Sequence, residues 1–292
     1  MTSTQQQQQQ QQLIHHTDHP GVEPAILFVH GFTCDETDWV NQVEHFGAVG
    51  QRVITVDLPG HGKSVGYNTS NLTMEAMSSE VVTLLHHLQV TRTIVVGHSM
   101  GTIIATEIAI QAPEMVVGIV LIDGSRIAKG NAEEAVAKSN ARFKQVGFTQ
   151  CMTATFEPMF LPDSDKQEKR RIINRACEQP EMTSIAILLS AVRWSAAHFE
   201  DRFSQLKVPV QVVQSSHRGE GHHQRVAVTP DMYIEWHHEL KKLGVDAKFD
   251  LVTDCGHFTM LDKPDVVNTN IERLLKQVQP TTTAQAPSVS AQ

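Results

Sequence analysis

Long apolar runs, paired cysteines and an excess of basic residues are all missing from this chain of 292 residues. Apolar segments such as 94–96 and 116–122 fall far short of the roughly 18 apolar residues that a membrane-spanning helix needs. The 24 Lys and Arg residues are outnumbered by 32 Asp and Glu residues, and no basic stripe is present to bind a phosphate backbone. The sequence therefore argues against a membrane or a nucleic acid as a partner.

The cysteines and the N-terminus indicate where the protein works. The four cysteines, Cys34, Cys151, Cys177 and Cys255, show no CxxC spacing, which is typical of free thiols in a reducing compartment. The N-terminus has neither the positive region nor the apolar region of a secretory signal. These features predict a cytoplasmic protein.

Both ends of the chain are of low complexity. The glutamine-rich segment 1–20 and the Thr/Gln/Ala/Ser/Pro-rich segment 279–292 hold few apolar residues that could offset the entropy of ordering. We therefore expect both ends to be disordered. The remaining length, 21–278, suits a single large α/β domain or an α/β domain that carries an insertion.

Short β-branched runs alternate with helical patterns along this central part. Because their apolar residues are consecutive rather than alternate, the runs are predicted to be strands buried on both faces of a parallel sheet. They lie at 25–30, 52–57, 93–97, 117–123, 208–214 and 247–253. The βαβ pattern stops between 126 and 206, where the sequence is helical and amphipathic. We expect 126–206 to be a helical cap on a core formed by 21–125 and 207–278.

One serine stands in a setting suited to nucleophilic catalysis. The pentapeptide GHSMG at 97–101 follows the predicted strand 93–97 directly and opens the next helix, which is the context that a G-x-S-x-G motif requires. Flanking glycines remove the Cβ atoms that would collide in so sharp a turn. At a helix N-terminus, Ser99 also lies where backbone N–H groups favour developing negative charge. The sequence therefore predicts Ser99 as a nucleophile.

Three further motifs complete a resemblance to the α/β-hydrolase family. They are HGFT at 30–33, DLPGHGKS at 57–64 and CGHF at 255–258. The resemblance covers nearly all of 21–278. It implies a mostly parallel, doubly wound sheet with an inserted helical cap, and an enzyme of the serine esterase or lactonase type.

The resemblance also implies roles for individual groups. His257 follows the last predicted strand and would act as the general base for Ser99. The main-chain N–H groups of Phe32 and Met100 would form the oxyanion hole. His30 is expected to brace the loop that carries Phe32.

The acid of the triad is ambiguous in this sequence. In the family it commonly follows the strand matched here by 208–214, where Gly-x-Asp or Asp-Asp is typical, but this chain has QSSHRGE at 214–220. Glu220 is the only carboxylate of that loop before Asp231, so the sequence favours Glu220. A minority arrangement places the acid after the preceding strand, where this chain has Asp123.

Other chemistries fit the sequence less well. A phosphate-binding loop ending at Gly62-Lys63 would need glycine at Asp57, and a dinucleotide fingerprint would need a small residue at Val65. No cofactor is therefore expected. The chain has 16 histidines, many in doublets, but it lacks HExxH spacing. His217, Glu220, His222 and His223 form a loop that could hold a metal, although such loops are more often solvated, so we predict no metal.

Cys255 is a second conceivable nucleophile. It lacks both a sharp strand-to-helix turn like that at Ser99 and an adjacent helix N-terminus that would lower the pKa of its thiol. We expect it to be a small buried filler.

Apolar side chains recur through the predicted cap and are expected to form mainly its own core. Phe32, Trp194 and Phe258 are predicted to contact the substrate. Few fixed charges are recognisable among the residues expected to face Ser99, which disfavours a highly anionic substrate. The sequence predicts cleavage of a carboxylic ester or lactone of a small, largely apolar molecule, through an acyl-enzyme.

Other activities remain open on the same site. They are an acyl-homoserine-type lactonase, a carbon–carbon bond hydrolase, a cofactor-free perhydrolase and, from another class, a ligand receptor built on a hydrolase fold. Nothing in the sequence fixes the oligomeric state.

Overall fold

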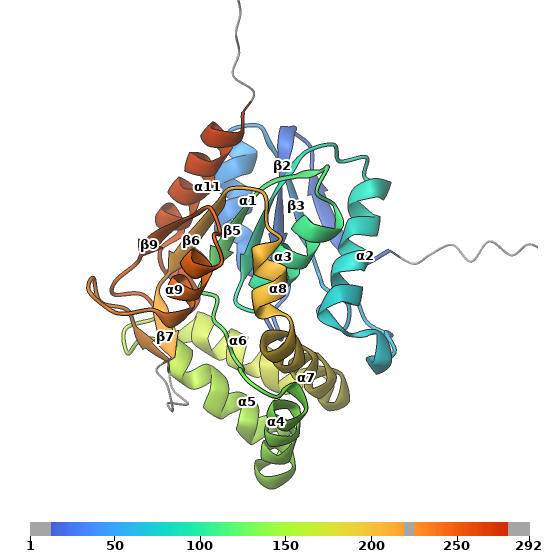
Figure 1. Ribbon diagram of the computed structural model, residues 1–292, viewed down its shortest axis with the longest axis vertical. Helices are drawn as coiled ribbons and strands as arrows, with labels where there is room; N and C mark the ends of the chain where they lie inside the picture. The colour runs from blue at the N-terminus through green and yellow to red at the C-terminus, as the bar shows by residue number, and fades with distance from the viewer. Residues whose placement is uncertain (1–12, 219–224, 280–292) are drawn as a thin grey trace, which may run out of the picture.

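A seven-stranded sheet forms the centre of the computed structural model, which describes residues 13–218 and 225–279 (Figure 1). The strand order is β1-β3-β2-β4-β5-β6-β9. β1 runs antiparallel to β3, and the other neighbouring pairs of this sheet are parallel. The strands are β1 (His16–His19), β2 (Val22–Val29), β3 (Gln51–Val56), β4 (Thr93–His98), β5 (Val116–Ile122), β6 (Val210–Gln214) and β9 (Ala247–Leu251).

The central strands are buried on both faces, as their consecutive apolar residues predict. Every residue of β4 is buried, and so are six of the seven residues of β5. Ile94 of β4 pairs with Ile26 of β2 and with Gly118 of β5. The mostly parallel sheet predicted from the sequence is confirmed.

Helices cover both faces of the sheet, which makes it doubly wound. Helices α1 (Val40–Ala48) and α11 (Pro264–Val278) pack on one face, and α2 (Met74–His87) and α3 (Gly101–Gln111) pack on the other (Figure 1). Two clusters of buried apolar side chains form the core, each joining the sheet to one of these helix layers. Short helices complete the connections: η1 (Glu36–Trp39), η2 (Thr69–Asn71), η3 (Glu157–Met159), α9 (Glu235–Lys242) and α10 (Thr259–Asp262).

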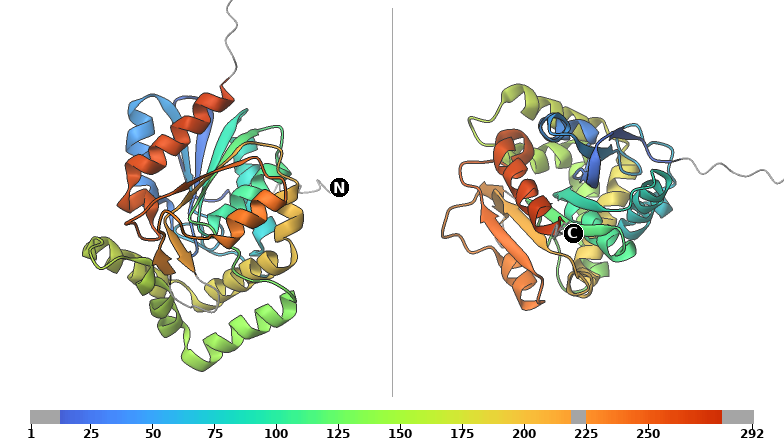
Figure 2. Two further views of the ribbon diagram at one scale, coloured as in Figure 1. Left: turned by 60° about the vertical axis from the view of Figure 1, so that its left-hand side comes forward. Right: turned by 90° about the horizontal axis from the view of Figure 1, so that it is seen from above.

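The segment between β5 and β6 is helical, as its amphipathic pattern predicts. It contains α4 (Ala132–Val146), α5 (Phe148–Phe156), α6 (Lys166–Glu178), α7 (Glu181–Ala197) and α8 (Phe199–Ser204). Helix α8 packs beside α3. We call α4 to α7 the cap helices; they gather at one end of the molecule, below the sheet in the left view of Figure 2. None of the helices that the structure describes is long and apolar enough to cross a membrane.

The folded part begins earlier than the sequence suggests. Within the predicted disordered segment 1–20, His16–His19 forms the edge strand β1, and Ile14 is buried in the core. The sequence HTDH has no apolar periodicity, because an edge strand does not need a buried side chain at every second position. The prediction of disorder is therefore wrong for residues 13–20, whereas 1–12 and 280–292 lie outside the described residues.

Candidate active site

Ser99 lies at a strained turn between β4 and α3. Its backbone φ is +55°, in the left-handed region that a residue with a side chain rarely adopts. A Cβ atom on Gly97 would come 2.1 Å from the carbonyl oxygen of Gly101, and one on Gly101 would come 2.4 Å from the carbonyl oxygen of Val29. Both flanking positions therefore require glycine, which is why GxSxG spacing accompanies this turn.

His257 lies in the loop between β9 and α10 and is buried. Its backbone N–H donates to Met159 O at 2.8 Å, and its carbonyl oxygen accepts from His98 Nε2 at 2.9 Å. Its ring Nδ1 is hydrogen-bonded to the carboxylate of Asp123. Because an ionised carboxylate only accepts, Nδ1 carries the proton, and Nε2 is the ring nitrogen that remains able to take one.

Asp123 is the carboxylate that meets His257 in the part of the chain described. It follows β5 directly, with φ at +47°, and is fully buried. Its Oδ1 accepts from Ser215 N at 2.9 Å, Ser216 N at 2.7 Å and Gln214 Nε2 at 2.9 Å. Burial opposes ionisation of Asp123, but the hydrogen bond from His257, the positive charge of a neighbouring guanidinium and the hydroxyl of Ser216 hold its pKa below its ordinary value. Asp123 is therefore an anion beside the imidazole.

The acid favoured from the sequence, Glu220, lies between the short strands β7 (Ser216–Arg218) and β8 (Arg225–Ala227), outside the described residues. The alternative acid, Asp123, occupies the position beside His257 Nδ1. The sequence signal for Asp123 is its position directly after a buried apolar strand, β5. This strand pairs with β4, the strand that leads into the turn at Ser99. The loop after β6 supplies backbone and hydroxyl donors to Asp123.

Sequence reasoning missed Arg225, which completes this cluster. Its guanidinium is buried, and Nη1 donates to Asp123 Oδ2 and to Ser216 Oγ, both at 3.0 Å. Its Nη2 donates to Ser125 Oγ at 3.3 Å. A buried cation needs such an anionic partner, but the partner is 102 residues away in sequence, and no local pattern predicts that pairing.

Two neighbouring charges act on His257 in opposite directions. Burial lowers the pKa of His257, and the positive charge of Arg225 lowers it further, whereas the hydrogen bond to Asp123 raises it. The pKa of His257 lies below its ordinary value, so the imidazole is neutral at neutral pH. A neutral imidazole is the form that can act as a general base.

Ser99 and His257 line one cavity of about 190 Å³. Ser99 Oγ makes no hydrogen bond to any described residue at this geometry, and such contacts commonly tighten only when substrate binds. The wall is largely apolar and comes from the core and from the cap helices. It includes Phe32, Met100, Ile103, Ile127, Phe143, Phe156, Met159, Leu188, Val192 and Phe258.

The three predicted substrate contacts have different outcomes. Phe32 and Phe258 line the cavity with Ser99, but Trp194 is absent from the described residues that line it. Trp194 is instead buried between α7 and the core, where its Nε1 donates to Glu107 Oε1 at 2.6 Å. The prediction fails for Trp194 because its side of α7 faces α3 and the buried Glu107 satisfies the indole N–H.

The two residues whose N–H groups are predicted to form the oxyanion hole lie at the cavity. Phe32 and Met100 both line the cavity, and neither backbone N–H donates a hydrogen bond to a described residue. His30 supports this loop, since its Nδ1 contacts Gly31 O at 2.8 Å and its Nε2 accepts from Leu58 N at 3.0 Å. Cys255 is fully buried, and burial raises the pKa of its thiol to about 12, which suits a filler better than a nucleophile.

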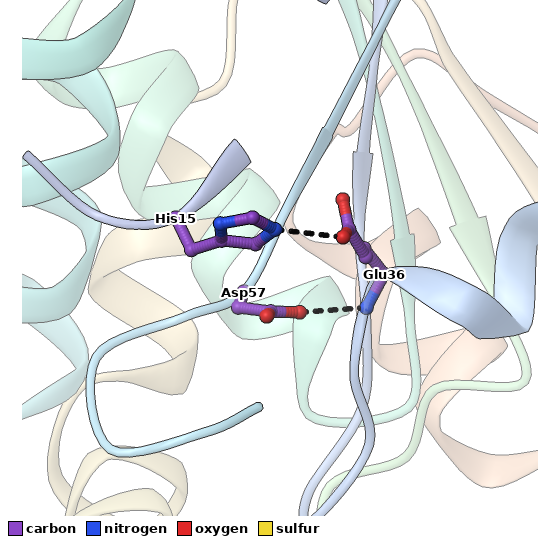
Figure 3. A group of neighbouring side chains, drawn as sticks. All are labelled: His15, Glu36 and Asp57. Carbon is purple, nitrogen blue, oxygen red and sulfur yellow. Dashed lines mark hydrogen bonds and ion pairs between the residues drawn. The ribbon is translucent and has the colours of Figure 1, made fainter. Parts of the chain in front are cut away.

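A separate group of polar side chains has the residue types of a metal site. His15, Glu36 and Asp57 place one ligand atom each within 4.8 Å of one another (Figure 3). However, Lys63 Nζ lies 3.1 Å from His15 Nε2 and 3.2 Å from Glu36 Oε1, and both Asp57 oxygens accept backbone N–H groups. The Lys63 ammonium already supplies the positive charge at this place, so we propose no metal for it. Of the histidine loop considered above, Glu220, His222 and His223 lie outside the described residues.

Comparisons with known proteins agree with this architecture. The model of a family described as the alpha/beta hydrolase family matches residues 26–269. A curated relative, the sn-1-specific diacylglycerol lipase ABHD11 of Mus musculus, is 26% identical over 82% of this chain and 77% of its own length. The chain spans only 33% and 49% of the length of two other curated relatives.

Solved structures share the fold at low sequence identity. The enol-lactonase from Burkholderia xenovorans LB400 superposes with a TM-score of 0.71 at 20% identity, covering 90% of this chain and 96% of that one. A thermophilic esterase from Thermogutta terrifontis superposes with a TM-score of 0.71 at 22% identity, covering 91% and 94%.

Proposed function

The chain belongs to the alpha/beta hydrolase family and is an enzyme, and we propose that it is a serine hydrolase that cleaves carboxylic ester or lactone bonds through an acyl-enzyme. One observation carries this proposal. Ser99, held at a left-handed φ of +55°, and His257, bonded through Nδ1 to Asp123, line the same cavity. A nucleophile, a neutral base and a buried anion behind the base are the groups that acyl transfer requires.

In the proposed first step, Ser99 Oγ attacks the carbonyl carbon of the substrate while His257 Nε2 takes the hydroxyl proton. Asp123 holds the neutral imidazole in the Nδ1-protonated tautomer and stabilises the imidazolium that forms. His257 then returns the proton to the departing alkoxide, which leaves as an alcohol and gives an acyl-Ser99 ester. In the second step, His257 takes a proton from water, the hydroxide attacks the acyl carbon, and Ser99 leaves with the proton.

We propose that the N–H groups of Phe32 and Met100 hold the oxyanion in both tetrahedral intermediates. The position of Ser99 next to the N-terminus of α3 supports this assignment, because helix N–H groups and the helix dipole favour negative charge there. Donors that are fixed before the reaction need no reorganisation as charge develops.

The lining of the cavity supports a small, largely apolar acyl group. The names of the similar proteins, a diacylglycerol lipase, an enol-lactonase and an esterase, describe enzymes that act on carboxylic ester or lactone bonds. We propose the same bond class for this chain. No cofactor takes part in the proposed steps.

A labelling and turnover experiment tests the proposal. The protein should react with a fluorophosphonate probe and hydrolyse some of a panel of p-nitrophenyl esters and lactones, and Ser99→Ala should abolish both. Absence of labelling and of turnover in the parent protein would exclude a serine hydrolase and favour a ligand receptor on this fold.

The choice of acid is tested by matched variants. Asp123→Asn keeps the shape of the side chain but removes its charge, and we expect kcat to fall by about 10³- to 10⁴-fold, as for loss of a triad acid. Glu220→Gln is the control and should keep kcat within about twofold, a change of about 0.4 kcal/mol. A large loss of kcat in Glu220→Gln, with kcat retained in Asp123→Asn, would reverse the assignment of the acid.

A further inference from the structure

Charge is unevenly distributed over the wall of the cavity that holds Ser99. Two arginines line it, Arg142 from α4 and Arg225 from β8, and no aspartate or glutamate is among the described residues that line it. Arg225 is already balanced by Asp123, to which its Nη1 donates at 3.0 Å. Among the described residues of the cavity wall, Arg142 therefore carries the charge that is left uncompensated.

Arg142 differs in this respect from Arg171, Arg175 and Arg193 of the cap helices, each of which pairs with a carboxylate. Across 13–218 and 225–279, no carboxylate oxygen lies within 4.0 Å of a guanidinium nitrogen of Arg142. Arg142 is exposed, yet it is one of the residues that line the cavity. A guanidinium so placed is available to an anion that enters from solvent.

Two hydroxyl groups share the cap side of the cavity with Arg142. Ser139 precedes Arg142 by one turn of α4 and so lies on the same face of the helix, and Thr155 lines the cavity from α5. Thr155 Oγ1 donates to Cys151 O at 2.7 Å, whereas Ser139 Oγ donates to none of the described residues. The cap side of the cavity thus offers a cation and a hydroxyl donor, while the reactive Ser99 is on the core side.

We infer that the substrate carries one carboxylate, outside the bond that is cleaved, and that Arg142 binds this carboxylate while Ser99 attacks the carbonyl. This inference rests on the proposed function. The planar guanidinium can donate two parallel hydrogen bonds to a carboxylate, and one uncompensated cation matches one negative charge. A doubly charged phosphate would bring a second charge into a largely apolar cavity without a partner.

Matched substrates test the inference. The mono-p-nitrophenyl esters of succinic, glutaric and adipic acid are to be compared with p-nitrophenyl butyrate, pentanoate and hexanoate, which have the same acyl lengths without the carboxylate. We expect a higher kcat/KM for at least one acidic ester than for its neutral partner. Arg142→Gln should lower the ratio of kcat/KM on the acidic ester to kcat/KM on its neutral partner about fivefold to tenfold, because a charge-assisted hydrogen bond is lost at a partly solvated site. Its kcat/KM on the neutral ester should stay within about twofold.

Lys144→Gln is the control for net charge, since Lys144 is exposed on the same helix and does not line the cavity. It should leave both values unchanged. Arg142→Lys should retain part of the preference for the acidic ester, because lysine keeps the charge but lacks the planar guanidinium that donates two parallel hydrogen bonds. If Ser99 is labelled and neutral esters are hydrolysed, but the ratio never exceeds one or is unaffected by Arg142→Gln, the inference is overturned while the proposed function stands.

Direct binding separates the inference from catalysis. In Ser99→Ala protein, calorimetric titration should show tighter binding of monomethyl glutarate than of dimethyl glutarate, and Arg142→Gln should remove the difference. Equal binding of the two esters would overturn the inference even if the parent protein proved inactive on every ester tested.

Discussion

At the scale of single residues, the candidate site places a cation where it opposes the function of the acid. Asp123 stabilises a protonated His257, whereas Arg225, bonded to the same carboxylate oxygen, destabilises it. His98 also faces the imidazole, with the two ring centroids 4.6 Å apart. Burial lowers the pKa of His98 to about 4, so this neighbour is neutral at neutral pH. The charge state of His257 is therefore set by its burial together with one anion, Asp123, and one cation, Arg225.

This balance predicts the pH dependence of catalysis. Activity requires neutral His257, so kcat/KM is lost as pH falls through the pKa of that histidine. Arg225→Met removes the cation, so the pKa of His257 should rise and the acid limb of the kcat/KM profile should move to higher pH. The profile is to be measured on a neutral p-nitrophenyl ester, with Arg225→Lys as the charge-preserving control. An acid limb that stays in place in Arg225→Met would contradict the assigned balance.

The turn at Ser99 makes a second prediction at this scale. Gly101→Ala would force a Cβ atom to within 2.4 Å of the Val29 carbonyl oxygen, and it should lower the free energy of unfolding by about 1–3 kcal/mol, as overpacking does. The control is Gly47→Ala in α1, where an added Cβ meets nothing within 4 Å, so that the variant should be stabilised by about 0.5–1 kcal/mol. Urea unfolding measures both. If Gly101→Ala leaves the free energy of unfolding unchanged, the turn relaxes enough to accommodate the added Cβ atom.

At the scale of elements, the cap helix α6 is attached to the core by ion pairs to a buried aspartate. Asp38, in η1 after β2, is fully buried and accepts from Arg171 Nη2 at 2.8 Å and from Arg175 Nη2. Arg175 also lies 2.7 Å from Asp35 Oδ1. Both arginines belong to α6, so this cluster joins α6 to the loop that carries Phe32.

Removing one member of this cluster should be costly. Asp38→Asn leaves two guanidinium groups short of a buried anion, and we expect the free energy of unfolding to fall by about 3 kcal/mol. Glu168→Gln breaks only the exposed pair with Arg171, and it should cost at most about 0.5 kcal/mol. Urea denaturation compares the two. Equal effects of the two variants would mean that the buried pair does not stabilise the attachment.

Several elements could be predicted from the sequence because their signals are local. The strand at 93–98 is a run of consecutive apolar residues, and the turn at Ser99 has its own glycine spacing. Strand β1 could not be predicted, because its polar residues are held by pairing with β3. The partner of His257 was equally beyond local patterns, since Asp123 and His257 are 134 residues apart, and only the folded sheet brings them together.

At the scale of the whole molecule, buried neutral histidines should govern stability in acid. Burial lowers the pKa of His61 and of His237 to about 3, while the unfolded chain protonates its histidines near pH 6.5. Below about pH 6.5 the unfolded state therefore binds more protons than the native state, and stability falls as pH falls, by about 1.4 kcal/mol per pH unit for each such histidine.

This slope is measurable by urea unfolding at pH 7, 6 and 5. His237→Asn should reduce the slope of stability against pH, whatever its effect at pH 7. An unaltered slope in His237→Asn would show that this histidine is not kept neutral by folding.

The backbone N–H of Ser99 donates to the carbonyl oxygen of Ile122 at 2.9 Å, and Ile122 is joined by its peptide bond to Asp123. One hydrogen bond and one peptide bond thus connect the two residues through the most buried pair of strands. Groups linked in this way can separate only when the sheet itself opens. The amide hydrogens of Ser99 and Asp123 should accordingly exchange with solvent only through global unfolding, and on heating their relative placement should persist up to the melting temperature of the whole protein.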